Sequence, residues 1–491
     1  MVEVRANESW HSSWFHLLLL LLLAAAAAAA SSCHGEKKQV LPLRELQLGD
    51  IKTSEKCLPQ RSRRVNGATI LEMKHQSYCS WSTKSREDRA WKLLALDNAR
   101  VSSLQSQIND AAMSYSAEKP SSSPPPAGAQ IPLNSGAKLQ TMNYIVTIQL
   151  GGKQMTVMVD TGSDLTWVQC KPCRSCYTQE DPLFDPAASP SYQPIPCNSS
   201  MCDSLQMATG VSGACGADQP SCNYALSYRD GSYTNGVLAR DRIDLAAVPV
   251  RGFVFGCGES NQGMFGGTSG LMGLGRSPLS LVSQTIPEFG GVFSYCLPTR
   301  EFDSSGSLIL GNDYSVYKNS TPVVYTRMIT DPQQASFYFL NLTGISIGGT
   351  ALRSSTQFNT QVLIDSGTVI TRLVPSVYKT LRDEFLWHFS GYPPAPGYSI
   401  LDTCFDLAGY KEVDVPTIRF TFDGDAEVDV DVNGVLYFAK PDASQVCLAF
   451  ASLSYEEEIG IIGNYQQKNL RVVYDTVGSK VGFAEETCGY S

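Results

Sequence analysis

The sequence predicts a mainly β protein built from two related lobes, and three observations support this. Short segments of alternating apolar residues, separated by Gly, Asn and Pro, follow one another from about residue 142 to the end of the chain. Few helical patterns intervene. A strand pattern that ends in a carboxylate occurs twice, and each copy is followed about a hundred residues later by two bulky apolar residues and a glycine. Internal repetition of this kind is typical of units built on one plan.

Period-two alternation indicates the strands of this region. They are Tyr144–Leu150, Met155–Val159, Tyr224–Tyr228, Gly252–Phe255, Ser307–Leu310, Phe337–Ile347, Val362–Ile364 and Arg471–Tyr474. The clearest helix is Pro375–Phe389, in which apolar residues are spaced by four. The repeat divides the region near residue 325. We therefore expect an N-terminal β lobe with a cysteine-rich insert over residues 139–325, and a C-terminal β lobe over residues 326–491.

Residues 1–31 predict a signal peptide. The 14-residue run Leu17–Ala30 contains only Leu and Ala, and Ser31 and Ser32 follow it. A membrane-spanning helix needs about 20 apolar residues, whereas small residues after a short apolar run suit signal peptidase. A retained membrane anchor is the alternative, because acidic residues offset the positive charge ahead of the run.

Residues 32–138 predict a removable pro-segment and linker, with a permanent disordered tail as the alternative. The segment is short of strand patterns, and its 85–108 stretch has the composition of a helix. Apolar residues fall near helical spacing there, although Asn98 interrupts their stripe. These residues are Trp91, Leu94, Val101, Leu104 and Ile108. The Ser- and Pro-rich run Pro120–Pro126 reads as an extended linker.

Charge is distributed unevenly along the chain. Residues 32–138 contain 16 Lys and Arg against 10 Asp and Glu, whereas residues 139–491 contain 21 against 35. The composition is that of a soluble globular protein, with 43% apolar and 17% charged residues. Phosphate contacts need clustered cations, so we expect no nucleic-acid partner for the acidic body. Such a body suits a protein that works in acid.

The repeated segment carries the chemistry. Its first copy leads into Asp160-Thr161-Gly162-Ser163, and its second leads into Asp365-Ser366-Gly367-Thr368. The downstream marks are Leu271-Met272-Gly273 and Ile461-Ile462-Gly463. Glycine permits a tight turn at the strand end, and the preceding hydroxyl can form a hydrogen bond with the opposite copy. One copy alone would indicate a surface turn, but two copies with two marks each indicate one shared site.

If the lobes face each other about a pseudo-twofold axis, Asp160 and Asp365 meet. Two carboxyl groups about 3 Å apart share a proton, because both cannot ionise comfortably. The charged member can then deprotonate a water while the neutral member polarises a peptide carbonyl. General acid–base positioning of this kind contributes roughly 10²–10⁴ in rate. The pair therefore predicts hydrolysis at acidic pH, with no cofactor.

From about residue 140 onward, the sequence resembles the pepsin-like aspartic endopeptidases, and within them the plant group that includes nepenthesins and chloroplast-nucleoid-type proteases. Besides both aspartate motifs and their apolar-apolar-Gly marks, the resemblance depends on Trp167, Tyr228–Ser232 and Phe255–Gly258. It implies a bilobal β fold with a central cleft, and Asp160 and Asp365 as the catalytic dyad. It also implies that the residues Thr161, Gly162, Ser366 and Gly367 brace the dyad.

The same resemblance implies a substrate flap formed by Tyr228, Arg229, Asp230 and Gly231, with the tyrosine closing over substrate. One residue departs from the family's pattern. The family usually has a small residue after the flap tyrosine, whereas this chain has Arg229. A long cation there would narrow the cleft or favour acidic side chains, so the departure bears on specificity more than on activity.

Fifteen cysteines in a chain with an export signal predict disulfides. Twelve of them lie from Cys170 onward. The spacing of Cys170, Cys173 and Cys176 also suits a metal knuckle, but this body has one histidine, far off in sequence, so we expect no metal. By resemblance to nepenthesins, the pairs are Cys170–Cys173, Cys176–Cys257, Cys197–Cys222, Cys202–Cys215, Cys296–Cys488 and Cys404–Cys447.

Three Asn-x-Ser/Thr sites in the body, at Asn198, Asn319 and Asn341, are candidate glycosylation sites. The sequence as a whole indicates a monomeric aspartic endopeptidase of polypeptides, made with its own pro-segment as inhibitor. We expect it in the secretory pathway, then outside the cell (the apoplast) or in the vacuole, with the chloroplast as the alternative. Two other functions stay open: a catalytically weak or inactive inhibitor or binding protein, and a DNA-associated protease that contacts DNA through its basic N-terminal part.

Overall fold

The computed structural model describes most of the chain. The described residues are 37–43, 60–75, 86–116, 144–215, 220–228, 232–263, 265–299, 305–317, 319–330, 336–352, 360–440 and 442–489. The expected signal peptide, the Pro-rich linker and Arg229, Asp230 and Gly231 of the expected flap lie outside them. Within these ranges, no helix is both long enough and apolar enough to span a membrane.

One long sheet runs through both lobes and contains 16 of the described strands. Its order is β15 (Val324–Arg327), β30 (Lys480–Glu485), β29 (Leu470–Asp475), β13 (Val292–Cys296), β14 (Gly306–Leu310), β3 (Ala68–His75), β4 (Tyr144–Leu150), β5 (Lys153–Asp160), β12 (Gly270–Gly273), β6 (Trp167–Gln169), β11 (Val248–Gln262), β10 (Tyr233–Leu245), β9 (Cys222–Ser227) and β8 (Ala214–Cys215), while β2 (Ser62–Val65) pairs with β3 and β7 (Gln193–Pro194) with β10.

The C-terminal lobe adds three smaller sheets within the described part of the chain. The first contains β24 (Ala426–Asp429), β23 (Ile418–Phe422), β16 (Phe339–Ile347), β18 (Thr360–Ile364), β28 (Gly460–Ile462), β19 (Thr371–Leu373) and β27 (Phe450–Ser452), with β17 (Thr350–Ala351) beside β16. The second contains β20 (Pro394–Ala395), β21 (Cys404–Phe405), β26 (Val446–Leu448) and β25 (Leu436–Phe438), and the third pairs β1 (Lys38–Pro42) with β22 (Glu412–Pro416).

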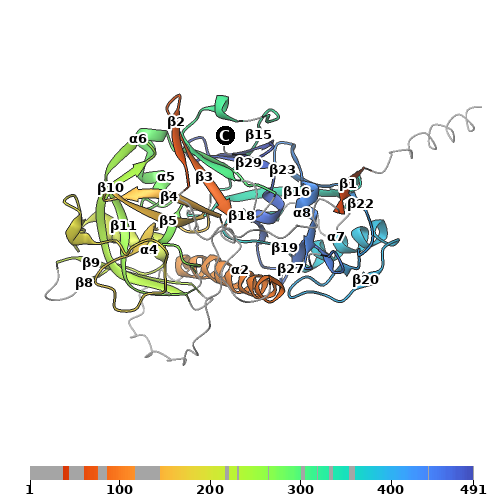
Figure 1. Ribbon diagram of the computed structural model, residues 1–491, viewed down its shortest axis with the longest axis horizontal. Coiled ribbons are helices and arrows are strands. Elements are labelled where there is room, and N and C mark those ends of the chain that lie inside the picture. Colours follow the sequence, from red (N-terminus) through yellow and green to blue (C-terminus); the bar gives the residue numbers. More distant parts are fainter. Residues whose placement is uncertain are drawn as a thin grey trace, which may run out of the picture.

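Within the described ranges, the α-helices are few and mostly short. They are α2 (Arg86–Ser116), α3 (Ser200–Asp203), α4 (Leu205–Thr209), α5 (Leu281–Gln284), α6 (Ile286–Phe289), α7 (Pro375–His388) and α8 (Val432–Val435). The predicted mainly β, bilobal fold is confirmed, and so is the helix expected over 375–389. Figure 1 shows the yellow and green N-terminal lobe beside the blue C-terminal lobe, with α2 lying along one side of both.

The core follows from the alternation read in the sequence. In β4 and β5, the side chains at alternate positions are buried on one side of the sheet, as period two requires, whereas β11 is buried continuously from Phe253 to Gly258. Val146, Val157 and Phe255 are among them, and Tyr338 of the C-terminal lobe joins the same cluster. A single apolar core therefore connects the two lobes and fixes the strands that end at the repeated aspartates.

The N-terminal segment contributes more strand than its sequence suggests. β3 lies between β14 and β4, pairing from Gly306 opposite Met73 to Leu310 opposite Thr69. Leu71 and Met73 are buried in the shared core. The expectation of a segment short of strands was wrong. β3 shows no clear alternation of its own, and it is completed by pairing with β14, more than 200 residues away in sequence, as well as with β2 and β4.

The helix expected over residues 85–108 is present as α2, and it continues to Ser116. Leu94, Val101, Leu104 and Ile108 are buried as predicted, whereas Trp91 is exposed. The stripe is not interrupted as the sequence suggested: Asn98 faces outward, and the buried Asp97 continues the contact face.

Candidate active site

The two aspartates occupy equivalent places in the two lobes. Asp160 ends β5, and Asp365 directly follows β18. Each of these strands is paired in parallel with the strand formed by its downstream mark: β12 places Gly273 opposite Asp160, and β28 places Ile462 opposite Ile364. Backbone bonds complete the support, from Leu274 N to Asp160 O and from Asp365 N to Ile462 O. The apolar-apolar-Gly marks therefore hold the ends of the aspartate strands in place.

The turn after each aspartate needs glycine because the opposite carboxylate lies against it. A Cβ on Gly162 would lie 2.8 Å from Oδ1 of Asp365, and one on Gly367 would lie 2.4 Å from Oδ1 of Asp160. Both distances are too short for a side chain. Each carboxylate also accepts the amide of its own glycine at 3.0 Å. The two carboxylates, which are almost fully buried, are thus brought face to face.

Hydroxyl groups fix the two turns to each other. Ser366 N donates to Thr161 Oγ1 at 2.9 Å, and Thr161 N donates to Ser366 Oγ at 3.2 Å. The side chains of Ser163 and Thr368 donate to Oδ2 of their own aspartates, at 2.7 Å and 2.6 Å. Two of the residues expected to brace the dyad, Thr161 and Ser366, therefore join the two turns directly.

Tyr228 directly follows β9, and its backbone N–H donates to the carbonyl of Ser232 at 2.7 Å. Its ring packs edge-on against Phe265, and its hydroxyl accepts from Nε1 of the fully buried Trp167 at 3.3 Å. The tyrosine is thereby anchored to the N-terminal lobe. The tip of the expected flap, including Arg229, lies outside the described residues.

A cation from α2 bridges the two aspartates. Arg100 Nη2 donates to Asp160 Oδ1 at 2.7 Å and to Asp365 Oδ2 at 2.9 Å, and Arg100 Nε donates to Asp365 Oδ2 at 3.1 Å. Burial opposes the charge on Arg100, but the two carboxylates outweigh it and raise the pKa of the guanidinium. The arginine therefore stays charged and occupies the place between the aspartates.

One turn earlier on the same helix, the charges are reversed: Asp97 of α2 is the anion, and the body provides the donors. Its carboxylate accepts from Val369 N at 2.6 Å, Ile370 N at 3.1 Å and Arg372 Nη2 at 2.9 Å. Both side chains of the Asp97–Arg372 pair are 1% exposed. Burial raises the pKa of Asp97 even though these three donors favour its anion, and burial lowers the pKa of Arg372.

The rest of α2 packs on the C-terminal lobe. Leu93 and Leu94 join a cluster with Tyr398, Tyr437 and Tyr465, whereas Val101, Leu104 and Ile108 pack against Phe337, Phe339, Leu363 and Ile461. Gln105 adds a paired contact with the backbone of Ile459, donating from Nε2 at 2.6 Å and accepting at Oε1 at 3.0 Å.

The sequence alone did not identify Arg100, Asp97 or Arg372 as site residues. Arg100 is one of 16 cations in residues 32–138, and no local motif distinguishes it. One signal in the sequence could have identified the two charged residues of the helix. A charged residue that interrupts the apolar face of an amphipathic helix lies on the side that packs against the protein. Such residues must find partners of opposite charge when that face is buried.

Asp164 is a further buried carboxyl group near the site, four residues beyond Asp160. It is 2% exposed, and its Oδ1 accepts from Ser277 N at 2.8 Å. Burial raises the pKa of Asp164 to about 6, although the bonds from Ser277 and Ser336 oppose the rise.

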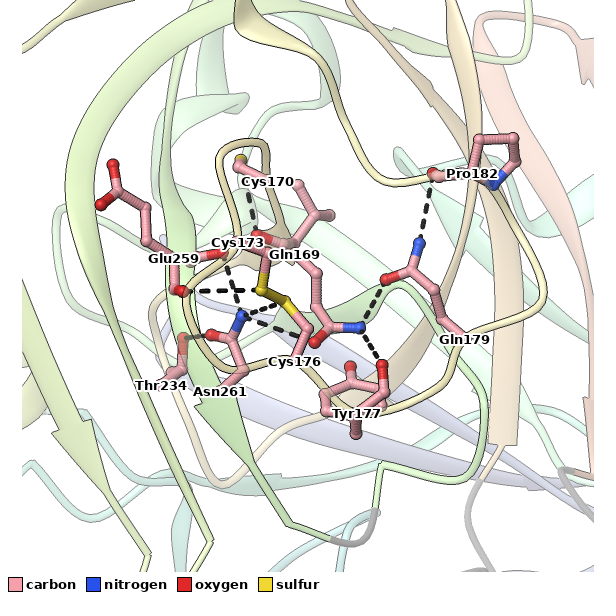
Figure 2. The surroundings of a disulfide bond; sticks show 12 residues. Gln169, Cys170, Cys173, Cys176, Tyr177, Gln179, Pro182, Thr234, Glu259 and Asn261 are labelled. Atoms are coloured by element: carbon pink, nitrogen blue, oxygen red, sulfur yellow. Dashed lines mark hydrogen bonds between the residues drawn. A yellow bond between two sulfur atoms is a disulfide. The ribbon is translucent and has the colours of Figure 1, made fainter.

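The twelve cysteines from Cys170 onward all form disulfides, but four of the expected pairings were wrong. Two of these errors involve the first triplet: the structure joins Cys170 to Cys257 and Cys173 to Cys176. Figure 2 shows the Cys173–Cys176 bond in a loop beside Glu259 and Asn261. Cys170 and Cys257 are both buried on neighbouring strands, whereas Cys176 is exposed and cannot reach the core.

The other two errors lie in the cysteine-rich insert, where the bonds are Cys197–Cys215 and Cys202–Cys222. Cys215 and Cys222 lie opposite each other on paired strands, so spacing cannot decide between them. Burial decides: Cys202 and Cys222 are buried, while Cys215 is exposed. The expected Cys296–Cys488 and Cys404–Cys447 bonds are present.

The three glycosylation candidates stay predictions. Asn198 and Asn319 are exposed, and Asn341 lies half-buried within β16.

Comparisons with known proteins agree with this geometry. The family described as "Xylanase inhibitor N-terminal" matches residues 144–312, and "Xylanase inhibitor C-terminal" matches residues 337–485. An aspartyl protease family protein of Arabidopsis thaliana is 44% identical over 81% of this chain and 82% of its own length. Aspartyl protease AED1 of Arabidopsis thaliana is 39% identical over 89% and 90%, and aspartic proteinase nepenthesin-1 of Nepenthes gracilis is 35% identical over 71% and 78%.

Among solved structures, soybean basic 7S globulin is similar in fold, with a TM-score of 0.55, 21% identity, and coverage of 71% of this chain and 92% of that chain. That similarity concerns the fold alone. The identity to aspartyl proteases extends over most of the chain and includes the strands that carry both aspartates. The chain therefore belongs to the plant pepsin-like aspartyl protease family.

Proposed function

We propose that the protein is an aspartic endopeptidase that hydrolyses peptide bonds at acidic pH and is made as a zymogen. The observation that carries this proposal is the single guanidinium of Arg100, which contacts both Asp160 and Asp365. An arginine held there shows that the two carboxylates converge on one point from two lobes. A peptide carbonyl placed at that point would lie beside both carboxyl groups, which is where an activated water would attack it.

The chemistry follows from the symmetry of the pair. With Arg100 withdrawn, two buried carboxyl groups facing each other share one proton. The charged member takes a proton from a water, and the neutral member donates to the carbonyl oxygen of the substrate. The glycine amides and the hydroxyls of Ser163 and Thr368 keep both groups oriented. No covalent intermediate and no cofactor are needed.

The pro-segment acts as the inhibitor in this proposal. Its net positive charge complements the acidic body, and Arg100 occupies the position of the reacting carbonyl. Burial raises the pKa of Asp97 in the docked helix, so this carboxyl group takes up a proton more readily when α2 is docked than when it is undocked. Its own contribution to docking therefore falls as pH rises, and Asp97 is not the group that releases α2 in acid.

The deciding experiment is proteolysis of a denatured protein at acidic pH by the wild type, Asp365→Asn and the control Asp383→Asn. Asp383 is a half-exposed residue of α7 paired with Lys379. We expect the wild type and Asp383→Asn to cleave, with inhibition by pepstatin-type compounds, and Asp365→Asn to lose activity by at least about a hundredfold. Equal activity in all three would refute the dyad.

A second candidate is a binding protein that inhibits another enzyme, which the xylanase-inhibitor family description favours. Retention of both aspartates, both bracing hydroxyls and Tyr228 supports the protease instead. A correctly folded wild type that cleaves nothing, with or without its pro-segment, would favour the binding protein.

No observation favours the DNA-associated alternative. Within the described part of the basic segment, Arg61 and Lys74 contact Glu72, and Arg100 contacts the dyad. The disulfides fit a secretory-pathway protein, and we propose the apoplast or the vacuole as its destination.

A further inference from the structure

Three donors of the body converge on one carboxylate of the pro-segment. Val369 N–H, Ile370 N–H and the Arg372 guanidinium all bind Asp97. Val369 and Ile370 lie in the turn that begins at Asp365, and Arg372 lies in β19 directly after it. This is an assembled anion site, because two backbone amides and a charged fork are the donors that carboxylates prefer.

The site belongs to the part of the chain that remains after processing, whereas its occupant belongs to the part that leaves. Besides Asp97, the Arg372 guanidinium donates to the carbonyl of Ile370 at 3.2 Å, and the hydroxyl of Tyr378 is the other titratable group whose charge acts on it. Arg100, on the same helix as Asp97, adds to the positive field around that carboxylate. When α2 departs, a buried guanidinium and two amides lose their anion together.

Leaving such donors without a partner is unfavourable, because a buried charge needs a compensating group. An anionic side chain of a bound peptide supplies one. We propose that Val369, Ile370 and Arg372 form a substrate subsite that selects Asp or Glu, with Asp97 of α2 occupying it in the zymogen. This inference deepens the proposed endopeptidase function and rests on it.

The position of Asp97 on α2 limits where the selected residue lies. Asp97 precedes Arg100 by three residues, which is about 4.5 Å along a helix axis. An extended peptide rises about 3.3 Å per residue. The selected acidic residue is therefore expected one to three residues from the bond that is cleaved.

The test uses acid-activated full-length protein and pairs of peptides that differ only in Glu against Gln, scanned over the residues on both sides of the cleaved bond. The readout is the Glu-to-Gln ratio of kcat/KM, so that a general change in activity cancels. At about pH 5, where a peptide Glu with a pKa of about 4.3 is mostly ionised, we expect a ratio of at least about 10 at one position. That ratio corresponds to about 1.4 kcal/mol.

The pH dependence and the variants separate a carboxylate site from other causes. At about pH 3 the peptide carboxyl is mostly neutral, so the ratio should fall towards 1. Arg372→Gln should remove the ratio at both pH values, and Arg372→Lys should retain part of it because the charge remains but the fork is lost. The matched control Arg327→Gln removes an exposed arginine paired with Asp423, and its ratio should equal that of the wild type.

A ratio near 1 at every position in the wild type overturns the subsite while leaving the protease intact. Loss of the ratio in Arg229→Gln, with retention in Arg372→Gln, also overturns it and assigns the preference to the flap.

If the activated protein cleaves nothing, the proposed function fails, and the same peptide pairs are compared as fluorescent ligands. At least about tenfold tighter binding of the Glu peptide to the wild type, lost in Arg372→Gln, then supports the subsite, and equal binding overturns it.

Discussion

Asp164 illustrates how a single buried residue adapts the fold to acid. Its carboxyl group lies away from water, with the amide of Ser277 as one donor, and burial raises its pKa to about 6 from an ordinary value of 3.8. Between those values the folded protein binds more protons than the unfolded chain. The contribution of Asp164 to the free energy of unfolding therefore falls as pH rises from about 4 to about 6.

Asp164→Asn should flatten this dependence. The amide oxygen of Asn keeps the bond from Ser277 N but carries no charge, so the variant should gain stability relative to the wild type near pH 7 and lose that advantage near pH 4. The size expected is on the order of 3 kcal/mol, or several degrees in Tm. Thermal unfolding from about pH 4 to about pH 7 measures it. Asp423→Asn, at a carboxylate 43% exposed, is the control, and parallel profiles in all three proteins would contradict the expectation.

At the scale of elements, α2 combines two kinds of contact. Its apolar face packs on the C-terminal lobe. It also forms two ion pairs with the body, in which Asp97 is the anion of one pair and Arg100 is the cation of the other. An isolated helix is marginal in water, so α2 gains most of its order from docking. Because the two ion pairs are buried, removing one partner of either pair should weaken docking strongly.

A peptide of residues 86–116 should therefore inhibit the activated enzyme. Arg100→Ala in the peptide should raise the inhibition constant by at least about tenfold, because the dyad loses its bridging cation. Ser102→Ala is the matched control. Among the described contacts, the Ser102 hydroxyl donates only to the carbonyl of Asn98, which lies in the same helix. Equal inhibition by all three peptides would exclude Arg100 as the inhibitory group.

The same scale shows what the sequence could and could not predict. The strands and turns around Asp160 and Asp365 were predictable because their pattern is local and occurs twice. The bridge from Arg100 was not, because it depends on how α2 packs against residues as distant as Asp365. The Cys202–Cys222 bond was missed for a similar reason: Cys215 and Cys222 lie side by side, and only burial, which the spacing does not contain, distinguishes them.

For the whole molecule, β3 makes the N-terminal segment part of the fold. It lies in the interior of the long sheet, between β14 and β4. A chain that starts at residue 139 would leave the side of β14 that faces β3 without a backbone partner, and it would remove the pairing of Tyr144 and Ile145 at the start of β4. Exposing a strand edge in this way is unfavourable and invites aggregation.

Refolding should therefore differ between the full chain and residues 139–491. We expect at least about a fivefold lower yield of soluble, compact protein from the shorter chain, and partial recovery when the N-terminal segment is supplied in trans. Gel filtration after refolding under disulfide-forming conditions measures the yield. Equal yields from the two chains would mean that β3 is dispensable for folding.

The two attachments of the N-terminal segment differ in chemistry. β3 is joined to the sheet by backbone hydrogen bonds with neighbouring strands, whereas α2 is joined to the body by side-chain ion pairs and apolar packing. The helix can therefore detach while the strand stays in place. A helix tethered in this way remains at a high effective concentration above the site, so its detachment is reversible until the connecting chain is cut. In the proposed zymogen, activation would then be a race between re-docking of the helix and cleavage of that chain.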